Sequence, residues 1–102
     1  MDIGFTDGKI RRLFNDFGLL CDRYGVDLAE IIATRMGVLR GAKHLGLVPQ
    51  RPPVSLRPVD GSPLAFTVDL APPRKLGIGA LDCGPDPIAL ERVQKIEVFG
   101  VE

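Results

Sequence analysis

The prolines divide this chain into two halves that must fold differently. None of the first 48 residues is a proline, and all nine prolines lie between residues 49 and 87. Because a proline inside a helix removes a backbone hydrogen bond and clashes with the preceding turn, long helices are expected only in the front half. The back half should form strands and turns. With 102 residues, the chain has room for one hydrophobic core and is expected to be a single domain, residues 1–102.

The front half shows helical spacing in two places. In residues 26–42 apolar side chains recur every three or four positions and line one stripe: Leu28, Ile31, Ile32, Met36 and Leu39. This pattern predicts the longest helix, with the stripe in the core. A shorter helix is expected within residues 7–18, DGKIRRLFNDFG, and Gly18 should end it.

Charged residues are expected to stabilise both ends of the longer helix. Asp27 and Glu30, three positions apart near its start, form an acidic variant of the capping box. Arg35, Arg40 and Lys43 complement the negative end of the helix dipole at the other end.

The back half shows the alternation of half-buried strands. Apolar side chains recur at every second position in residues 54–59, 66–70 and 75–81, and a last strand is expected in 96–101. A short N-terminal strand at Ile3 and Phe5 is compatible with the sequence. Helices followed by an antiparallel sheet predict an α+β fold, in which the longer helix covers the sheet.

The strand expected at 75–81, KLGIGAL, has an unusual face. Leu76 and Ile78 project on one side, and a cation followed by two glycines, Lys75, Gly77 and Gly79, stands on the other. Glycine weakens a strand, so its repeated use indicates sheet curvature or a ligand that approaches the backbone closely. The two interpretations are compatible, because a sheet bent by glycine makes a concave surface with Lys75 at its rim.

The charges are balanced overall but unevenly spread. Thirteen Lys and Arg match thirteen Asp and Glu, so the total gives no reason to expect a strong polyanion or membrane binder. Residues 35–75 carry seven cations against two acids, a net charge of +5. Such a block is more often a solvated face than a phosphate site. Cations that converge would nevertheless suit a phosphodiester, because they stabilise the charge that develops when phosphorus is attacked.

The sequence carries no metal or redox motif. Cys21 and Cys83 are far apart, without CxxC spacing or a histidine cluster, so neither a metal nor a cofactor is expected. His44, the only histidine, is interpreted as a cap of the longer helix rather than a general base. The start, MDIGFTDGKI, lacks the features of a secretory signal, and no apolar run reaches membrane-spanning length, so a cytoplasmic location is expected.

Four segments, taken in order, cover nearly the whole chain: MDIGFTDGKIRRLFND, YGVDLAEIIATRMGVLRGAKHLGLVP, LAFTVDLAPPRKLGI and VQKIEVFGVE. Together they resemble the RelE/ParE-like toxins of bacterial type II toxin–antitoxin systems, especially the plasmid-maintenance "killer protein" branch typified by HigB. The resemblance rests on the order and character of the segments more than on one motif. It implies a small cytoplasmic protein in which two N-terminal helices pack on a curved antiparallel sheet.

The resemblance also implies an activity and partners. Many members cut messenger RNA in the ribosomal A site, and an antitoxin from the neighbouring reading frame neutralises them. The implied partners are therefore a cognate antitoxin, the ribosome and mRNA, in a homodimer or a toxin–antitoxin hetero-oligomer. Relatives of the ParE type poison DNA gyrase instead, so the fold alone does not fix the target.

By position, the resemblance assigns roles to six cations. Lys75 falls where these toxins usually place an arginine, at the start of the strand after a hairpin, and it is the implied catalytic cation together with Arg57. The implied RNA contacts are Arg40, Lys43, Arg51 and Arg74.

One departure from the family pattern bears on catalysis. HigB-like chains commonly continue past a segment like VFGVE with an Asp-Tyr-His ending that contributes to the active site, whereas this sequence stops at Glu102. A full gene sequence with that ending would favour an endoribonuclease. A gene without it would favour a non-catalytic, truncated or decayed toxin-like module that binds a protein partner.

Overall fold

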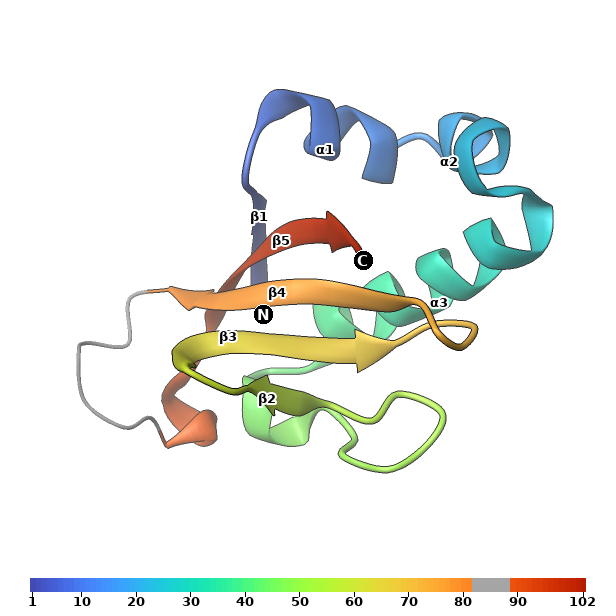
Figure 1. The fold of residues 1–102 in the computed structure, drawn as a ribbon. Coiled ribbons are helices and arrows are strands. Elements are labelled where there is room, and N and C mark those ends of the chain that lie inside the picture. The colour runs from blue at the N-terminus through green and yellow to red at the C-terminus, as the bar shows by residue number, and fades with distance from the viewer. Residues whose placement is uncertain (82–88) are drawn as a thin grey trace.

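The computed structural model describes residues 1–81 and 89–102 and shows an α+β fold, as the sequence predicts (Figure 1). Two short 3₁₀ turns, η1 (Leu45–Leu47) and η2 (Leu90–Arg92), accompany three helices and five strands. The helices are α1 (Gly8–Phe14), α2 (Phe17–Tyr24) and α3 (Val26–Gly41). The strands are β1 (Asp2–Phe5), β2 (Arg57–Val59), β3 (Ser62–Asp69), β4 (Lys75–Leu81) and β5 (Lys95–Val101).

The five strands form one mixed sheet in the order β1-β5-β4-β3-β2. The pairs β2–β3, β3–β4 and β4–β5 are antiparallel, so the prediction of an antiparallel sheet after residue 53 is confirmed. The expectation that the sheet as a whole is antiparallel is wrong, because β1 pairs in parallel with β5, with Ile3 opposite Ile96. The N-terminal strand at Ile3 and Phe5 precedes all the helices, and the helical segment connects it to the rest of the sheet.

The front half forms three α-helices rather than the expected two. The side chain of Asp7 accepts a hydrogen bond from the Ile10 amide (2.9 Å) and caps α1. Asp16 accepts one from the Leu19 amide (3.1 Å) and caps α2. Because this second cap starts a new helix immediately after the first, Gly18 lies inside α2 and does not end a helix.

The longest helix forms where the apolar stripe predicts it. Ile32, Met36 and Leu39 of α3 are buried in one core cluster with sheet residues such as Ile78 and Val98. Leu28 and Ile31 pack partly buried against the same cluster. The core therefore lies between α3 and one face of the sheet.

The ends of α3 differ from the prediction. Its N-cap is Gly25, with φ of 85°, and Asp27 lies within the first turn, so the capping box with Glu30 does not form. Glycine adopts this left-handed conformation without steric cost, which lets the chain turn directly from α2 into α3. The C-cap is Ala42, and His44 instead precedes η1, so its predicted capping role was wrong.

The strand expected at 54–59 forms only from Arg57 onward. Val54 and Leu56 are buried as the alternation predicts, but Ser55 between them has φ of 51°. A residue in the left-handed region interrupts an extended strand. Cys83 and most of the loop expected around it lie outside the described residues, and η2 supplies a helical turn after them. Among the described helices, none is both long and apolar enough to cross a membrane.

Candidate functional site

The sheet has one face in the core and one face outside it, and the candidate site lies on the latter, here called the outer face. Leu76 and Ile78 of β4 are completely buried in the core. Lys75 and Gly77 alternate with them and therefore face outward, as the sequence predicts. Their partners on β3 are Asp69 and Thr67, which lie directly opposite and share that face.

Three charged side chains form a row across one end of the outer face, here called the charged end. Lys75 begins β4 and pairs in register with Asp69, the last residue of β3. Arg57 begins β2, opposite Thr67, and its Nη2 lies 3.5 Å from Oδ2 of Asp69. The structure thus brings the two expected catalytic cations, Lys75 on β4 and Arg57 on β2, to either side of one carboxylate on β3, the strand between them.

The two glycines of β4 lie under an aromatic ring. A Cβ atom added at Gly79 would lie 2.5 Å from Cζ of Phe99, and one at Gly77 would lie 3.6 Å from the Phe99 Cβ. The ring of Phe99, from the neighbouring strand β5, therefore covers the backbone of β4. The register of β4 and β5 shifts between Gly77 and Ile78, so that Phe99 is an extra residue in a β-bulge.

This packing changes the interpretation of the glycines. The Phe99 side chain occupies the space above Gly77 and Gly79. A phosphate on this part of the outer face would therefore contact the ring and not the glycine backbone. The bulge supplies the local bend that the curvature interpretation requires. The alternating pattern therefore has two separate causes: Lys75 supplies a charge, and Gly77 and Gly79 leave room for the Phe99 side chain.

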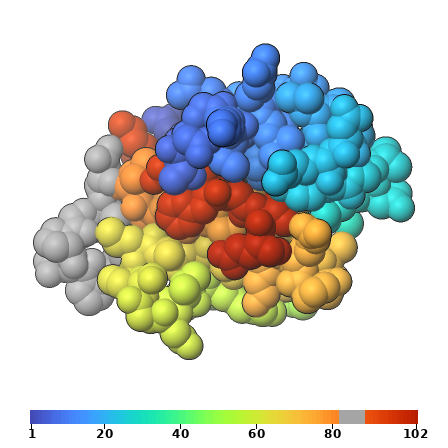
Figure 2. Space-filling model, turned by 45° about the horizontal axis from the view of Figure 1, so that its top comes forward, coloured from blue at the N-terminus to red at the C-terminus, as the bar shows by residue number. Residues whose placement is uncertain are grey.

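The C-terminal end of β5 lies beside the charged end. The Glu102 amide donates a hydrogen bond to the Lys75 carbonyl (2.8 Å). A carboxylate oxygen of Glu102 also lies close to the Gly77 backbone, 3.1 Å from where a Cβ would stand. In the space-filling view the C-terminal residues, in red, are exposed between the blue N-terminal helical segment and the yellow and orange strands β3 and β4 (Figure 2). Any residues that followed Glu102 would therefore start next to Lys75.

The four expected RNA contacts are not gathered in one place. Arg74, next to Lys75 in the chain, lies with its guanidinium 5.7 Å from the centroid of the Tyr24 ring and joins the β3–β4 turn to α2. Arg51 lies exposed in the loop before β2, where its carbonyl accepts from the Ser55 amide (2.9 Å).

The other two expected contacts lie at the end of α3. Nη2 of Arg40 is 3.4 Å from Oδ1 of Asn15, between α1 and α2, and the Arg40 carbonyl accepts from the N-terminal ammonium (3.2 Å). Lys43 is exposed just after the helix. The structure thus links Arg40 to the N-terminal part of the fold and not to the charged end.

The sequence analysis missed two residues, Asp69 of the charged end and Arg35, which supports it from α3. Arg35 lies in the middle of α3, only 9% exposed, and not at its end. Its Nε donates to the Asp69 carbonyl (2.7 Å) and its Nη2 to the Pro53 carbonyl (3.2 Å). A signal was present, because Arg35 falls between Ile32 and Met36 within the apolar stripe, and a buried arginine needs acceptors.

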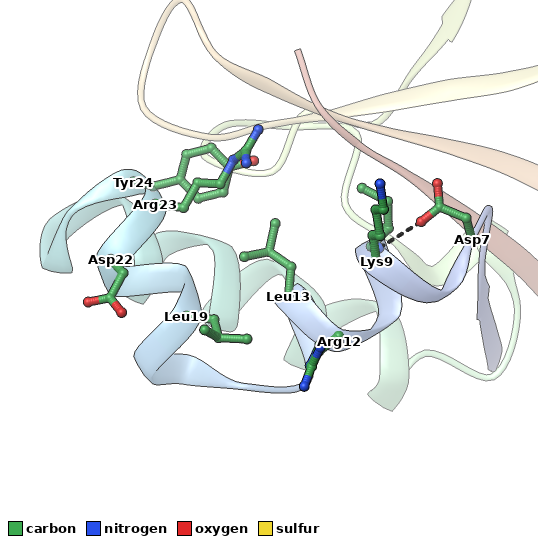
Figure 3. Close-up of a pocket in the computed structure, with 9 residues that line it drawn as sticks. Asp7, Lys9, Arg12, Leu13, Leu19, Asp22, Arg23 and Tyr24 are labelled. Atoms are coloured by element: carbon green, nitrogen blue, oxygen red, sulfur yellow. Dashed lines mark hydrogen bonds between the residues drawn. The ribbon is translucent and has the colours of Figure 1, made fainter.

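A groove lies between α1 and α2, with a volume of about 540 Å³ (Figure 3). Its lining combines apolar and charged side chains: Asp7, Lys9, Ile10, Arg12, Leu13, Leu19, Asp22, Arg23 and Tyr24. Ile10 also approaches Gly100 of β5, since a Cβ added there would lie 3.6 Å from Cδ1 of Ile10. The groove therefore borders the end of the strand that reaches Lys75.

Known proteins provide no further guide to this site. No family model matches the chain, and no curated protein or solved structure matches it. Among the described residues, no group of His, Cys, Asp and Glu side chains could hold a metal ion.

Proposed function

We propose that this protein is the cytoplasmic toxin of a type II toxin–antitoxin system and cleaves mRNA on the ribosome until a cognate antitoxin neutralises it. The family resemblance of the sequence motivates this proposal. The single observation that supports it best is the placement of Lys75 and Arg57 on one face of the sheet, on the two strands that flank β3. Lysine and arginine side chains are long enough to reach across one intervening strand toward the same phosphodiester.

The chemistry that suits these residues is an internal phosphoryl transfer. The 2′-oxygen of a message nucleotide attacks the adjacent phosphorus, the bond from phosphorus to the 5′-oxygen breaks, and a cyclic phosphate forms. The 2′-hydroxyl loses its proton, and the departing 5′-oxygen gains one. Lys75 and Arg57 stabilise the extra negative charge on phosphorus during this step, which is where fixed cations accelerate a reaction most.

The first prediction concerns Lys75→Ala. Loss of a charge-stabilising cation should cost about 2–4 kcal/mol of transition-state stabilisation, or roughly 30- to 1000-fold in cleavage rate. Thermal stability should stay near that of the parent, because the side chain is partly exposed and lies outside the core. The measurement is cleavage of mRNA on programmed ribosomes, with the full natural C-terminus present, alongside thermal melting.

Lys9→Ala is the matched control, because Lys9 is an exposed lysine on α1. It should cleave like the parent. If Lys75→Ala cleaves as well as the parent, or if it melts at a much lower temperature, Lys75 is not the catalytic cation.

The groove between α1 and α2 favours a second function, that of a non-catalytic module that binds a protein. A lining that combines apolar and charged side chains is typical of a surface that binds a partner. A parent chain that does not cleave, but co-purifies in a fixed ratio with the product of the neighbouring reading frame, would favour this function. Inhibition of DNA supercoiling in a parallel assay would instead favour a gyrase inhibitor of the ParE type.

A further inference from the structure

Asp69 occupies the position between the two cations of the charged end. It lies directly opposite Lys75 in the register of β3 and β4, so the two side chains start about 5 Å apart on the same face. On its other side, Oδ2 of Asp69 lies 3.5 Å from Nη2 of Arg57. The Asp69 carboxylate is thus the neighbour of both Lys75 and Arg57, the two cations that stabilise charge in the proposed reaction.

The backbone of Asp69 is held from two directions. Its amide donates to the Val54 carbonyl (2.7 Å), and its carbonyl accepts from Nε of the buried Arg35 (2.7 Å). Through its second hydrogen bond, to Pro53, Arg35 also fixes the loop that leads into β2 and Arg57. The same buried arginine therefore sets the place of Asp69 and of the segment that carries its partner.

The two oxygens of Asp69 have different surroundings. Oδ2 contacts Arg57, whose side chain is 53% exposed and is therefore accessible to a ligand on the outer face. Oδ1 is buried and has no hydrogen-bond partner within the part of the chain that the structure describes. The carboxylate side chain as a whole is 24% exposed, so it is accessible from the outer face without being fully solvated.

We propose that Asp69 is a positioning residue that holds the Arg57 guanidinium beside Lys75, an inference that rests on the proposed function. The two cations lie on the strands that flank β3 and repel each other, and the carboxylate on β3 offsets this repulsion before RNA arrives. An arginine held in place needs no reorganisation when charge develops on phosphorus. The same carboxylate repels the phosphates of bound RNA, so it should weaken ground-state binding while it assists catalysis.

This double effect gives Asp69→Asn a specific kinetic signature. Loss of a group that acts directly costs about 10²–10³-fold in kcat, so loss of a group that positions it should cost less, about tenfold. Removal of one negative charge near the RNA should lower KM about threefold. A purely structural residue would not lower both constants, because damage to the fold weakens binding as well.

The experiment compares four variants on programmed ribosomes: Asp69→Asn, Arg57→Gln, the double variant and Asp60→Asn. Asp60, in the exposed turn between β2 and β3, gives a matched control with the same change of charge and should retain the parent kcat. If Asp69 acts through Arg57, the double variant should have the kcat of Arg57→Gln alone. Side-chain NMR provides a readout without cleavage, because the Arg57 Nε–H signal should be distinct in the parent and averaged with exposed arginines in Asp69→Asn.

The outcomes separate the two proposals. If the parent cleaves and Asp69→Asn keeps its kcat, or if kcat falls further in the double variant than in Arg57→Gln, the positioning role is overturned. If the parent does not cleave, the proposed function is overturned, and the NMR signal still tests the pair. An Arg57 signal that is the same in the parent and in Asp69→Asn overturns the claim that Asp69 holds Arg57.

Discussion

The two ends of the outer face serve different physical requirements although they share one strand. At the charged end, Lys75, Asp69 and Arg57 lie on three adjacent strands and interact through charge. Further along β4, Gly77 and Gly79 have no side chains, and Phe99 of β5 lies over them, 43% exposed. The first end depends on the orientation of polar groups, whereas the second depends on the shape of one ring.

This difference shows that a single pattern in a strand can have two causes. A cation and two glycines at alternate positions suggest one ligand site when only the strand itself is considered. In the sheet, the glycines accommodate a neighbour within the protein, and the cation belongs to a row that crosses the strands. The two ends should therefore respond differently to substitution.

The largest effect is expected at the charged end from Arg35→Leu. This change removes the donors to the Asp69 and Pro53 carbonyls and leaves both acceptors without their buried partner. Unfolding free energy should fall by about 2–4 kcal/mol, measured by chemical denaturation. Arg40→Leu on the same helix, where the side chain is exposed, should cost less than about 1 kcal/mol. Equal costs for the two variants would show that Arg35 does not support the charged end.

At the other end of the outer face, where Phe99 lies over the glycines, Gly79→Val should destabilise the fold by about 1–2 kcal/mol, because the new side chain overlaps the Phe99 ring. The ring can swing outward, which limits the cost to its lost contacts. In a Phe99→Ala background the same change should be neutral or stabilising, because valine favours strands more than glycine does. Chemical denaturation of the four chains in this cycle measures the coupling. If Gly79→Val costs the same with and without Phe99, the ring is not the reason for the glycine.

Local sequence patterns correctly predicted the helices and strands in which buried side chains recur at a regular spacing. The stripe of α3 and the alternation of β3, β4 and β5 depend on neighbours within each segment, and all four elements form as expected. The outward direction of Lys75 and Gly77 followed from the same alternation. These features need only the period of a helix or a strand.

The features that were missed depend on partners far away in the sequence. Phe99 lies over Gly79 only because β5 pairs with β4 and contains a bulge, and neither the pairing nor the bulge is visible in either strand alone. The parallel pairing of β1 also involves residues more than 90 positions apart. Arg35 was assigned to a helix end by its charge, although its place within the apolar stripe indicated burial with a partner.

The smallest effect is expected from Gly77→Ala, which tests whether the two glycines are equivalent. A Cβ at Gly77 would lie 3.1 Å from a carboxylate oxygen of Glu102, at the exposed end of a flexible side chain, and at an ordinary contact distance from Phe99. The carboxylate can move at little cost, and alanine loses less backbone entropy on folding than glycine does. Unfolding free energy should therefore change by less than about 0.5 kcal/mol, and any change should favour the folded state. Denaturation beside Gly79→Ala completes the test, because the Phe99 ring lies much closer to Gly79 and alanine there should be the more destabilising of the two. A larger cost at Gly77 would mean that the C-terminal residues, and not the ring, determine where glycine is required.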